Sequence, residues 1–376
     1  MRAVLALLAA AIVAVAAAGG AGAAPPQVDA TAFLVEDAAT GQVLGSSGAH
    51  DHVPIASITK LMTVLVVLDH HKLSDVVDVD PRAAGVGEES IYLRRDEELT
   101  VRDLLKGALI QSANDAADAL ALSVAPSFPA FATLMNAKAA ELGLTDSHFV
   151  RPDGLDAPGE YSSAADVTKL ARAAMRIRFI RDTVRERTDT IAGGRTLHTW
   201  DDLLGVVPGL FGVKTGHTGN AGWCQVAVVR GRGVTVYATI LGSPSRGERN
   251  DDLRALLAWG LAQFRVVAAI DPSRTYAEVK LPFGKAPVAL RASRGLNAVV
   301  RVGHPLVERV SAAAVASLPV RAGQALGHIE VWDGKRLVGR RDLVASRAVA
   351  RPDAAARVRW YARRTLHHLL HFISSL

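Results

Sequence analysis

The sequence predicts an α/β domain in which helices flank an antiparallel sheet, followed by a small all-β domain and a C-terminal amphipathic helix. Three observations lead to this prediction. The region before Pro272 opens with a hairpin pattern, continues with helix patterns and closes with three strand patterns. Beyond Pro272, short segments alternate apolar and polar residues. After residue 350, apolar and basic side chains fall on opposite faces of a helix.

Residues 1–24 are predicted to be a secretory signal peptide rather than part of the fold. Arg2 precedes an unbroken apolar run, and Ala21-Gly22-Ala23 fits a signal-peptidase site. The alternative is an uncleaved membrane anchor. The small residues and Pro25-Pro26 that follow the run favour cleavage, so we expect an exported protein.

Residues 25–270 should form the α/β domain. Its sheet is expected from a hairpin at 32–47 and from three strands within 209–243, so both ends of the region contribute to one sheet. The segment 57–71 is apolar nearly all round, which indicates a buried helix. Residues 99–125 should form two helices that break at 111–114, because Ser and Asn favour caps and turns. Further helices are expected at 127–144, 162–176 and 251–264.

Residues 271–350 are predicted to be the all-β domain, with Asp333-Gly334 as a hairpin turn. Residues 351–376 should form a helix with one apolar arc and one arc of Arg and His side chains, from which Trp360 is the exception. The apolar run is too short to span a bilayer, so contact with an anionic membrane surface is expected. The alternative is a terminal helix docked on the protein's own domain.

Composition excludes several classes of function. The chain has 376 residues, enough for two domains, and a formal net charge of +6 without a basic stripe interleaved with aromatics, so nucleic acid is not an expected partner. Its single cysteine, Cys224, can form no internal disulfide and lies in a strand pattern as a core thiol. The pairs His70-His71 and His367-His368 lack further metal ligands, and we expect no metal or cofactor.

The candidate chemistry begins with Ser57 and Lys60, three positions apart at the start of the buried helix. Side chains at this spacing share a helix face. Serine is a poor nucleophile unless a base takes its proton, and a buried lysine with a lowered pKa can be that base. The chain has 34 arginines and only nine lysines, yet arginine could not serve here because it stays protonated.

Two further motifs raise the specificity of this pattern. Ser112-Ala113-Asn114 lies at the helix break, where a hydroxyl and an amide can point together into a cleft. Lys214-Thr215-Gly216 lies on the first late strand, where Lys214 and Thr215 suit an anionic substrate end and Gly216 allows a close backbone approach. Each motif alone means little, but the three in this order are highly specific.

With these motifs the chain resembles the penicillin-binding proteins and class A β-lactamases. It most closely resembles the low-molecular-mass penicillin-binding proteins, the D-alanyl-D-alanine carboxypeptidases of the peptidase S11 type, from about Val28 to the end. The resemblance includes "ASITKLMT", "QSANDAADALA" and "GVKTGHTGNAGWC". It implies a penicillin-binding-protein/β-lactamase-like transpeptidase domain, a β-rich second domain and an amphipathic anchor.

The resemblance also implies roles for the site residues. Ser57 would attack the carbonyl between two terminal D-alanines of a peptidoglycan stem peptide, with Lys60 as general base. Ser112 would relay the proton to the leaving D-alanine, and Asn114 would orient Lys60. The remaining implied residues are Lys214, which would lower the pKa of Lys60 and bind the carboxylate with Thr215, and Ser57 and His217, whose backbone N–H groups would form the oxyanion hole. β-Lactam antibiotics would acylate Ser57.

Several positions depart from the family pattern. Pro244 stands where close relatives place an arginine that helps hold the substrate carboxylate, and Arg246 is the expected substitute. Arg151 and Asp153 replace the usual asparagine and histidine, and Asp201 stands where asparagine is common. Two rival functions are a β-lactamase, which would need a separate deacylating base, and a noncatalytic cell-wall binding protein, which would have lost Ser57 or Lys60.

Overall fold

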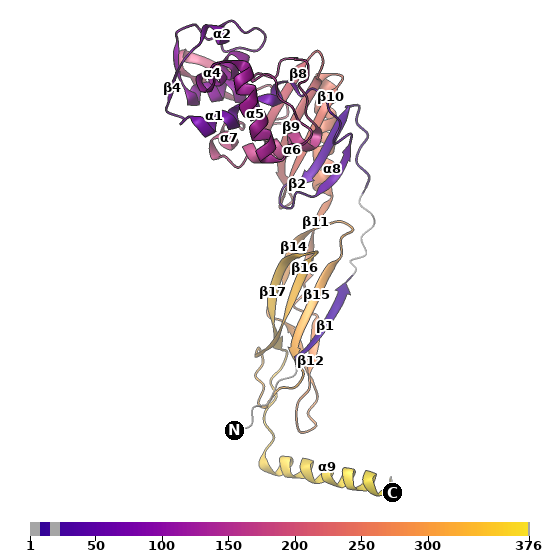
Figure 1. Cartoon of the computed structure of the whole chain (residues 1–376). Helices are drawn as coiled ribbons and strands as arrows, with labels where there is room; N and C mark the ends of the chain where they lie inside the picture. Colours follow the sequence, from indigo (N-terminus) through magenta and orange to yellow (C-terminus); the bar gives the residue numbers. More distant parts are fainter. Residues whose placement is uncertain (1–7, 16–22, 375–376) are drawn as a thin grey trace. The chain divides into compact units, whose positions relative to one another are not determined.

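The computed structural model describes residues 8–15 and 23–374. The chain divides into two compact units, of which the first is Ala23–Gln263 and the second begins at Phe264. Figure 1 shows the elements of both units with their labels. Each unit has a hydrophobic core of its own.

The sheet of the first unit joins the two ends of that unit, as predicted. Its five strands lie in the order β3-β2-β10-β9-β8, and every neighbouring pair is antiparallel. The strands are β2 (Ala32–Asp37), β3 (Val43–Ser47), β8 (Leu210–Thr218), β9 (Gly222–Gly231) and β10 (Val234–Ser243). Strand β8 forms one edge of the sheet, so its outer side is open to the helical part of the unit.

Two helices cover opposite faces of this sheet. Gly260 of α8 (Arg246–Ala262) lies so close to β10 that a Cβ there would be 2.8 Å from the Val236 side chain. Thr168 of α6 (Ala164–Ala174) bonds to the Thr239 hydroxyl of the same strand at 2.7 Å. Since side chains alternate along a strand, Val236 and Thr239 point to opposite faces, and so the helices lie on opposite sides.

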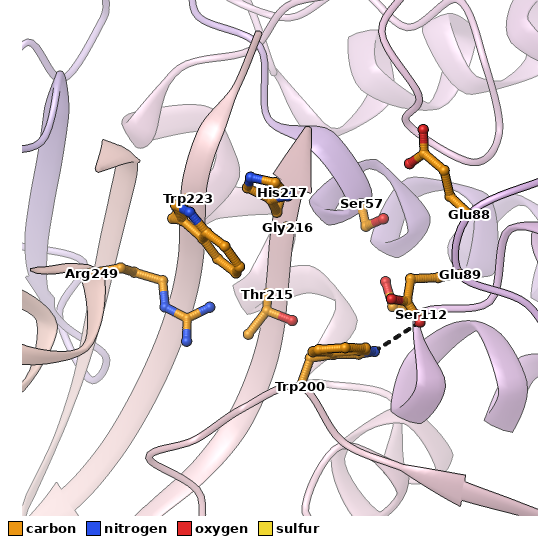
Figure 2. Close-up of a pocket in the computed structure, with 10 residues that line it drawn as sticks. All are labelled: Ser57, Glu88, Glu89, Ser112, Trp200, Thr215, Gly216, His217, Trp223 and Arg249. Carbon is orange, nitrogen blue, oxygen red and sulfur yellow. Dashed lines mark hydrogen bonds between the residues drawn. The ribbon is translucent and has the colours of Figure 1, made fainter. Parts of the chain in front are cut away.

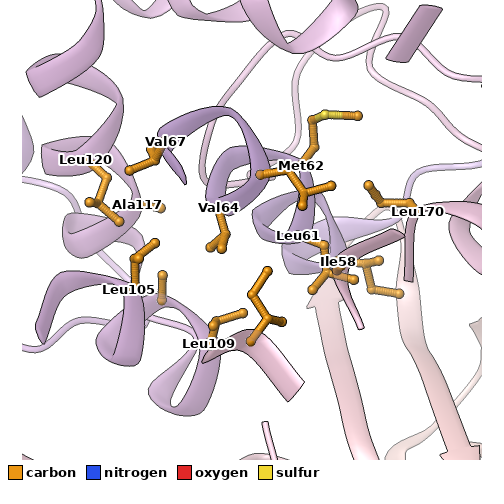
Figure 3. Packing of buried hydrophobic residues seen from close by; sticks show 14 of the residues in the cluster. Ile58, Leu61, Met62, Val64, Val67, Leu105, Leu109, Ala117, Leu120 and Leu170 are labelled. Atoms are coloured by element: carbon orange, nitrogen blue, oxygen red, sulfur yellow. The ribbon is translucent and has the colours of Figure 1, made fainter. Parts of the chain in front are cut away.

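Helix α1 (Lys60–His70) runs through the core of the first unit, as its apolar sequence predicts. Lys60 and the seven residues after it are all buried, and Figure 3 shows several of them among side chains from neighbouring helices. The other helical elements of this unit are η1 (Ala56–Thr59), α2 (Pro81–Ala84), α3 (Val101–Lys106), η2 (Gly107–Gln111), α4 (Asn114–Val124), α5 (Phe128–Leu142), α7 (Arg178–Thr183) and η3 (Ala192–Gly194).

The predicted break between two helices is confirmed at Ser112. The π-helical turn η2 ends there, because Ser112 adopts a left-handed conformation with φ of 64° and Ala113 is extended before α4 begins. Two small two-stranded sheets complete the unit; they are formed by β4 (Val76–Asp78) with β5 (Glu98–Thr100), and by β6 (Thr188–Ile191) with β7 (Arg195–His198).

The second unit is built of β-strands and one helix, and its boundary differs from the predicted one. Phe264–Ile270 forms strand β11, which pairs with β14 (Leu296–Arg301). The unit therefore begins at Phe264 rather than at residue 271, because β11 follows α8 without a loop that would mark the change. The remaining strands are β12 (Thr275–Val279), β13 (Val288–Ala292), β15 (Leu306–Ala313), β16 (Ala325–Asp333) and β17 (Arg336–Ala345).

These strands form a sheet of order β1-β15-β16-β17-β13-β12. The predicted turn at Asp333-Gly334 is confirmed as the hairpin between β16 and β17. Strand β1 (Leu8–Val15) lies within the predicted leader and pairs with β15 at the edge of the sheet; the rest of the leader before Ala23 is outside the described residues, and the leader remains a prediction.

The predicted C-terminal helix is present as α9 (Ala354–Ser374). Trp360, the exception to its apolar arc, packs edge-on against Phe283 of the same unit with ring centroids 5.6 Å apart. Exposed apolar side chains on α9 include Val358, Leu366 and Leu370. No single helix among the described residues has the length and apolar content of a membrane span. Helices α4 and α5 meet these length and composition criteria only when taken together, and they are bent by 87° at the break between them.

Candidate active site

The candidate nucleophile Ser57 lies in the turn η1, which runs directly into α1. Ala56, the residue before it, has a φ of 49°, a left-handed conformation that costs a non-glycine residue about 1 kcal/mol or more. The edge strand β8 packs against this turn: a Cβ added at Gly216 would lie 2.7 Å from the Ile55 carbonyl oxygen. Glycine at 216 is therefore required by packing within the protein.

Lys60 is fully buried and holds three partners with its ammonium group. Nζ donates to Ser57 Oγ at 2.7 Å, to Asn114 Oδ1 at 2.7 Å and to the Asp153 carbonyl oxygen at 2.6 Å. Burial lowers the pKa of Lys60 from its ordinary value to about 8, although the nearby carboxylates of Asp153 and Asp118 oppose this change. At that pKa about a tenth of the molecules carry a neutral amine at pH 7.

The hydrogen-bond partners of Lys60 would fix the direction of the lone pair on its neutral amine. This amine has two N–H groups and one lone pair, and two of its three partners, the Asn114 and Asp153 oxygens, can only accept hydrogen bonds. The Asn114 amide is fixed in this orientation because its Nδ2 donates to the Gly87 carbonyl at 3.2 Å. The lone pair of Lys60 is then directed at Ser57 Oγ, whose hydroxyl proton it can accept.

A second lysine stands beside the second hydroxyl. Lys214 Nζ donates to Ser112 Oγ at 2.7 Å and to the Thr215 carbonyl at 2.9 Å. Burial lowers the pKa of Lys214 well below its ordinary value, and the charge of Lys60 lowers it further. Two ammonium groups in one buried region disfavour each other, so each makes the neutral form of the other easier to reach.

These groups open onto a cavity of about 230 Å³. Figure 2 shows the residues that line it. The structure brings five of the predicted site residues together in its wall, and those are Ser57, Ser112, Thr215, Gly216 and His217. Lys60, Asn114 and Lys214 lie buried behind the hydroxyl groups. The cavity thus exposes the hydroxyls of Ser57 and Ser112, and the lysine that each hydroxyl contacts is buried away from water.

The protein matches the model of one family, described as D-alanyl-D-alanine carboxypeptidase of the peptidase S11 type, over residues 20–245. The chain belongs to this family. D-alanyl-D-alanine carboxypeptidase DacD of Salmonella typhimurium is 31% identical over 90% of this chain and 90% of its own length. The resemblance drawn from the three motifs is thereby confirmed.

Solved structures of such proteins share the fold. Penicillin binding protein 5 from Haemophilus influenzae superposes with a TM-score of 0.64 at 25% identity, covering 88% of this chain and 100% of that one. Penicillin binding protein 6B from Escherichia coli superposes with a TM-score of 0.63 at 29% identity, covering 86% and 97%. The predicted fold class, with its transpeptidase domain, β-rich domain and terminal helix, is confirmed.

Arg246, the expected carboxylate-binding arginine, does not line the cavity. It is held by Asp202, to which Nε and Nη2 donate at 2.7 and 2.5 Å. Arg249, one turn later on α8, lines the cavity and is 1% exposed. Figure 2 shows its guanidinium beside Trp223 and directed toward Thr215. Arg249 is therefore the one arginine among the described residues that line this cavity.

Sequence reasoning also missed four other cavity residues, which are Glu88, Glu89, Trp200 and Trp223. Glu89 and Trp200 meet across the cavity, where the indole Nε1–H donates to Glu89 Oε2 at 3.1 Å. The loop that carries Glu89 is fixed to the site because Asn114 N donates to the Glu89 carbonyl at 2.7 Å. No local sequence signal marks these residues, since they reach the site only through the path of the loops.

The departures at Arg151 and Asp153 affect the surroundings of Lys60. Arg151 pairs with the buried Asp153 carboxylate through Nε at 3.0 Å and Nη2 at 2.5 Å, and the Asp153 carbonyl accepts from Lys60. Burial raises the pKa of the neighbouring Asp118 to about 8. Cys224 is confirmed as a core thiol because it is fully buried, and this burial raises its pKa to about 12. Asp201 is buried and accepts from the Leu203 backbone N–H at 3.0 Å.

Proposed function

We propose that the protein is a serine-type D-alanyl-D-alanine carboxypeptidase in which Ser57 carries the acyl group and Lys60 is the general base. The substrate is a peptidoglycan stem peptide that ends in two D-alanines, from which the enzyme removes the last residue. The observation that carries this proposal is the position of Lys60 Nζ, which is fully buried and 2.7 Å from Ser57 Oγ.

The terminal carboxylate of the substrate is held at one end of the cavity. Thr215 offers a hydroxyl there, and the guanidinium of Arg249 and the ammonium of Lys214 supply positive charge. Nε and Nη2 of Arg249 donate hydrogen bonds to neighbouring side chains. Nη1 donates to none of the described residues, so it is left to donate to a ligand. This binding places the D-alanyl-D-alanine amide beside Ser57.

Acylation follows from the proton positions. As the lone pair of Lys60 takes the Ser57 proton, Oγ attacks the amide carbon. The backbone N–H groups of Ser57 and His217 stabilise the oxyanion, each by about 3 kcal/mol in the transition state. Ser112, held by Lys214, relays the proton that Lys60 took to the leaving nitrogen, so Lys60 is neutral again when D-alanine departs. Water then cleaves the ester; a penicillin instead forms a penicilloyl ester that leaves slowly.

A fluorescent penicillin tests this assignment. The native protein should be labelled covalently, and Ser57→Ala should abolish the label while its unfolding midpoint stays within a few degrees of native. Release of D-alanine from a pentapeptide substrate should be lost in the same variant. Labelling that persists in Ser57→Ala would exclude Ser57 as the nucleophile, and rapid hydrolysis of the drug would favour a β-lactamase.

We also infer that the mature enzyme is exported and rests on the outer face of the plasma membrane through α9. Export is inferred from the apolar run after Arg2 and from Ala21-Gly22-Ala23, which fits a signal-peptidase site. Exposed apolar residues of α9, Val358, Leu366 and Leu370, support interfacial binding.

Vesicle sedimentation tests the membrane proposal. The protein should bind vesicles rich in phosphatidylglycerol, and Leu366→Glu should weaken that binding at least fivefold. The matched control is Leu337→Glu, which places the same charge at an exposed leucine of β17 and should leave binding unchanged. Equal binding by both variants would exclude α9 as the anchor.

A further inference from the structure

Glu89 is the one carboxylate-bearing residue of the cavity wall that is partly shielded from solvent; Glu88 beside it is exposed. Figure 2 shows the Glu89 carboxylate next to Ser112 and bonded to Trp200. Neither the serine-lysine pair nor the carboxylate-binding residues account for an acid at this position. A carboxylate beside an acylated serine can act as a base in the second half of the reaction, the hydrolysis of the acyl-enzyme.

The Glu89 side chain is held by one oxygen and available at the other. Oε2 accepts the indole N–H of Trp200 at 3.1 Å, and no described residue donates a hydrogen bond to Oε1. The backbone on either side is anchored, because the Gly87 and Glu89 carbonyls both accept from Asn114. The free oxygen therefore keeps a fixed place in the cavity beside Ser112.

This place is beside Ser112, which also lines the cavity. Ser112 relays the proton to the leaving nitrogen in the proposed function, on which this inference rests, so Glu89 lies near the path of the departing D-alanine. Once D-alanine has gone, a cavity of about 230 Å³ has room for several water molecules. A water there approaches the ester carbon along the path of the departed nitrogen, with Glu89 at its back.

We propose that Glu89 is the residue that accepts the proton of the hydrolytic water and so speeds release of the acyl group. In this step the water oxygen bonds to the ester carbon while its proton passes to Glu89 Oε1. The intermediate then collapses and the bond from carbon to Ser57 Oγ breaks. Oγ receives the proton that Glu89 took, relayed through Ser112 and Lys60, so Ser57, Lys60 and Glu89 all return to their starting forms.

The electrostatic surroundings suit this role. Burial raises the pKa of Glu89 above its ordinary value, while Lys214 and Lys60 keep it from rising further. The carboxylate is thus a stronger base than a solvated one. The three family motifs offer no such base, because Ser-x-x-Lys, Ser-x-Asn and Lys-Thr-Gly contain no acid.

The test separates formation of the penicilloyl-enzyme from its breakdown. Glu89→Gln keeps an oxygen that can accept the Trp200 N–H, and the matched control Glu88→Gln removes the same charge from the adjacent exposed residue. Glu89→Gln should be acylated by a fluorescent penicillin within about twofold of the native rate, but it should release the label at least tenfold more slowly. Glu88→Gln should release it within about twofold of native.

A chemical rescue distinguishes proton transfer from structural support. Hydroxylamine, a stronger neutral nucleophile than water, should release the label from Glu89→Gln and the native protein at similar rates. Native release rates in Glu89→Gln, equal slowing in both variants, or parallel loss of acylation and release would each overturn the proposal. A native protein that takes no label would overturn the proposed function itself, a result distinct from all of these.

Discussion

Arg249 and Arg246 offer a sharp test, because only one of them reaches the cavity. Arg249→Lys removes the Nη1 group that is left to donate to a substrate carboxylate but keeps the positive charge. A hydrogen bond to a charged group contributes about 1.5–3 kcal/mol, so kcat/KM for D-alanine release should fall by about tenfold to a hundredfold. Arg246→Lys, whose partner is Asp202 outside the cavity, should stay within about threefold of native.

The assay is release of D-alanine from a pentapeptide with a free terminal carboxylate, compared with the same peptide amidated at that end. Arg249→Lys should lower the preference for the free acid, since the amide makes no use of the guanidinium charge. Thermal unfolding of each variant controls for the loss of the Arg249 contact with Asp202 at 3.1 Å. A large loss in Arg246→Lys with a native-like Arg249→Lys would refute the reasoning.

Two further substitutions test the surroundings of Ser57. Gly216→Ala would place a Cβ 2.7 Å from the Ile55 carbonyl; β8 must move from η1, and acylation by fluorescent penicillin should slow at least tenfold, whereas an unchanged rate would show that the contact is unimportant. Asp118 has a pKa of about 8 in the fold against 3.8 ordinarily, so the native state keeps a proton that the unfolded chain releases, and stability falls through this group between about pH 4 and pH 8. Asp118→Asn should therefore raise the unfolding midpoint more at pH 8 than at pH 5, and an equal shift at both would contradict the assignment.

The parts of the site that local spacing determines could be predicted. Ser57 and Lys60 are one turn apart at the start of a buried helix, so their contact follows from helix geometry. Ser112 and Asn114 could be placed at a helix break because their side chains compete with helical hydrogen bonds. The sequence does not reveal that the Asp153 carbonyl is the third partner of Lys60, because that contact depends on a loop 93 residues away.

The parts that depend on packing direction could not be predicted. Arg246 and Arg249 share a helix and a residue type, and Ser245 caps that helix by accepting from the Glu248 N–H at 3.1 Å. Which arginine turns toward β8 is decided by how α8 lies on the sheet and by the position of Asp202. The start of the second unit was placed too late for a similar reason, since β11 is recognised as part of it only through its pairing with β14.

The central claim is that a neutral Lys60 takes the proton from Ser57, and the pH dependence of acylation tests it most directly. With a pKa of about 8 for Lys60, the neutral fraction rises from about a tenth at pH 7 to about nine tenths at pH 9. The rate constant for acylation by a fluorescent penicillin should therefore increase about ninefold over this range and level off above it. A rate that is flat between pH 6 and pH 9, or that Lys60→Arg leaves intact, would contradict a neutral amine as the base.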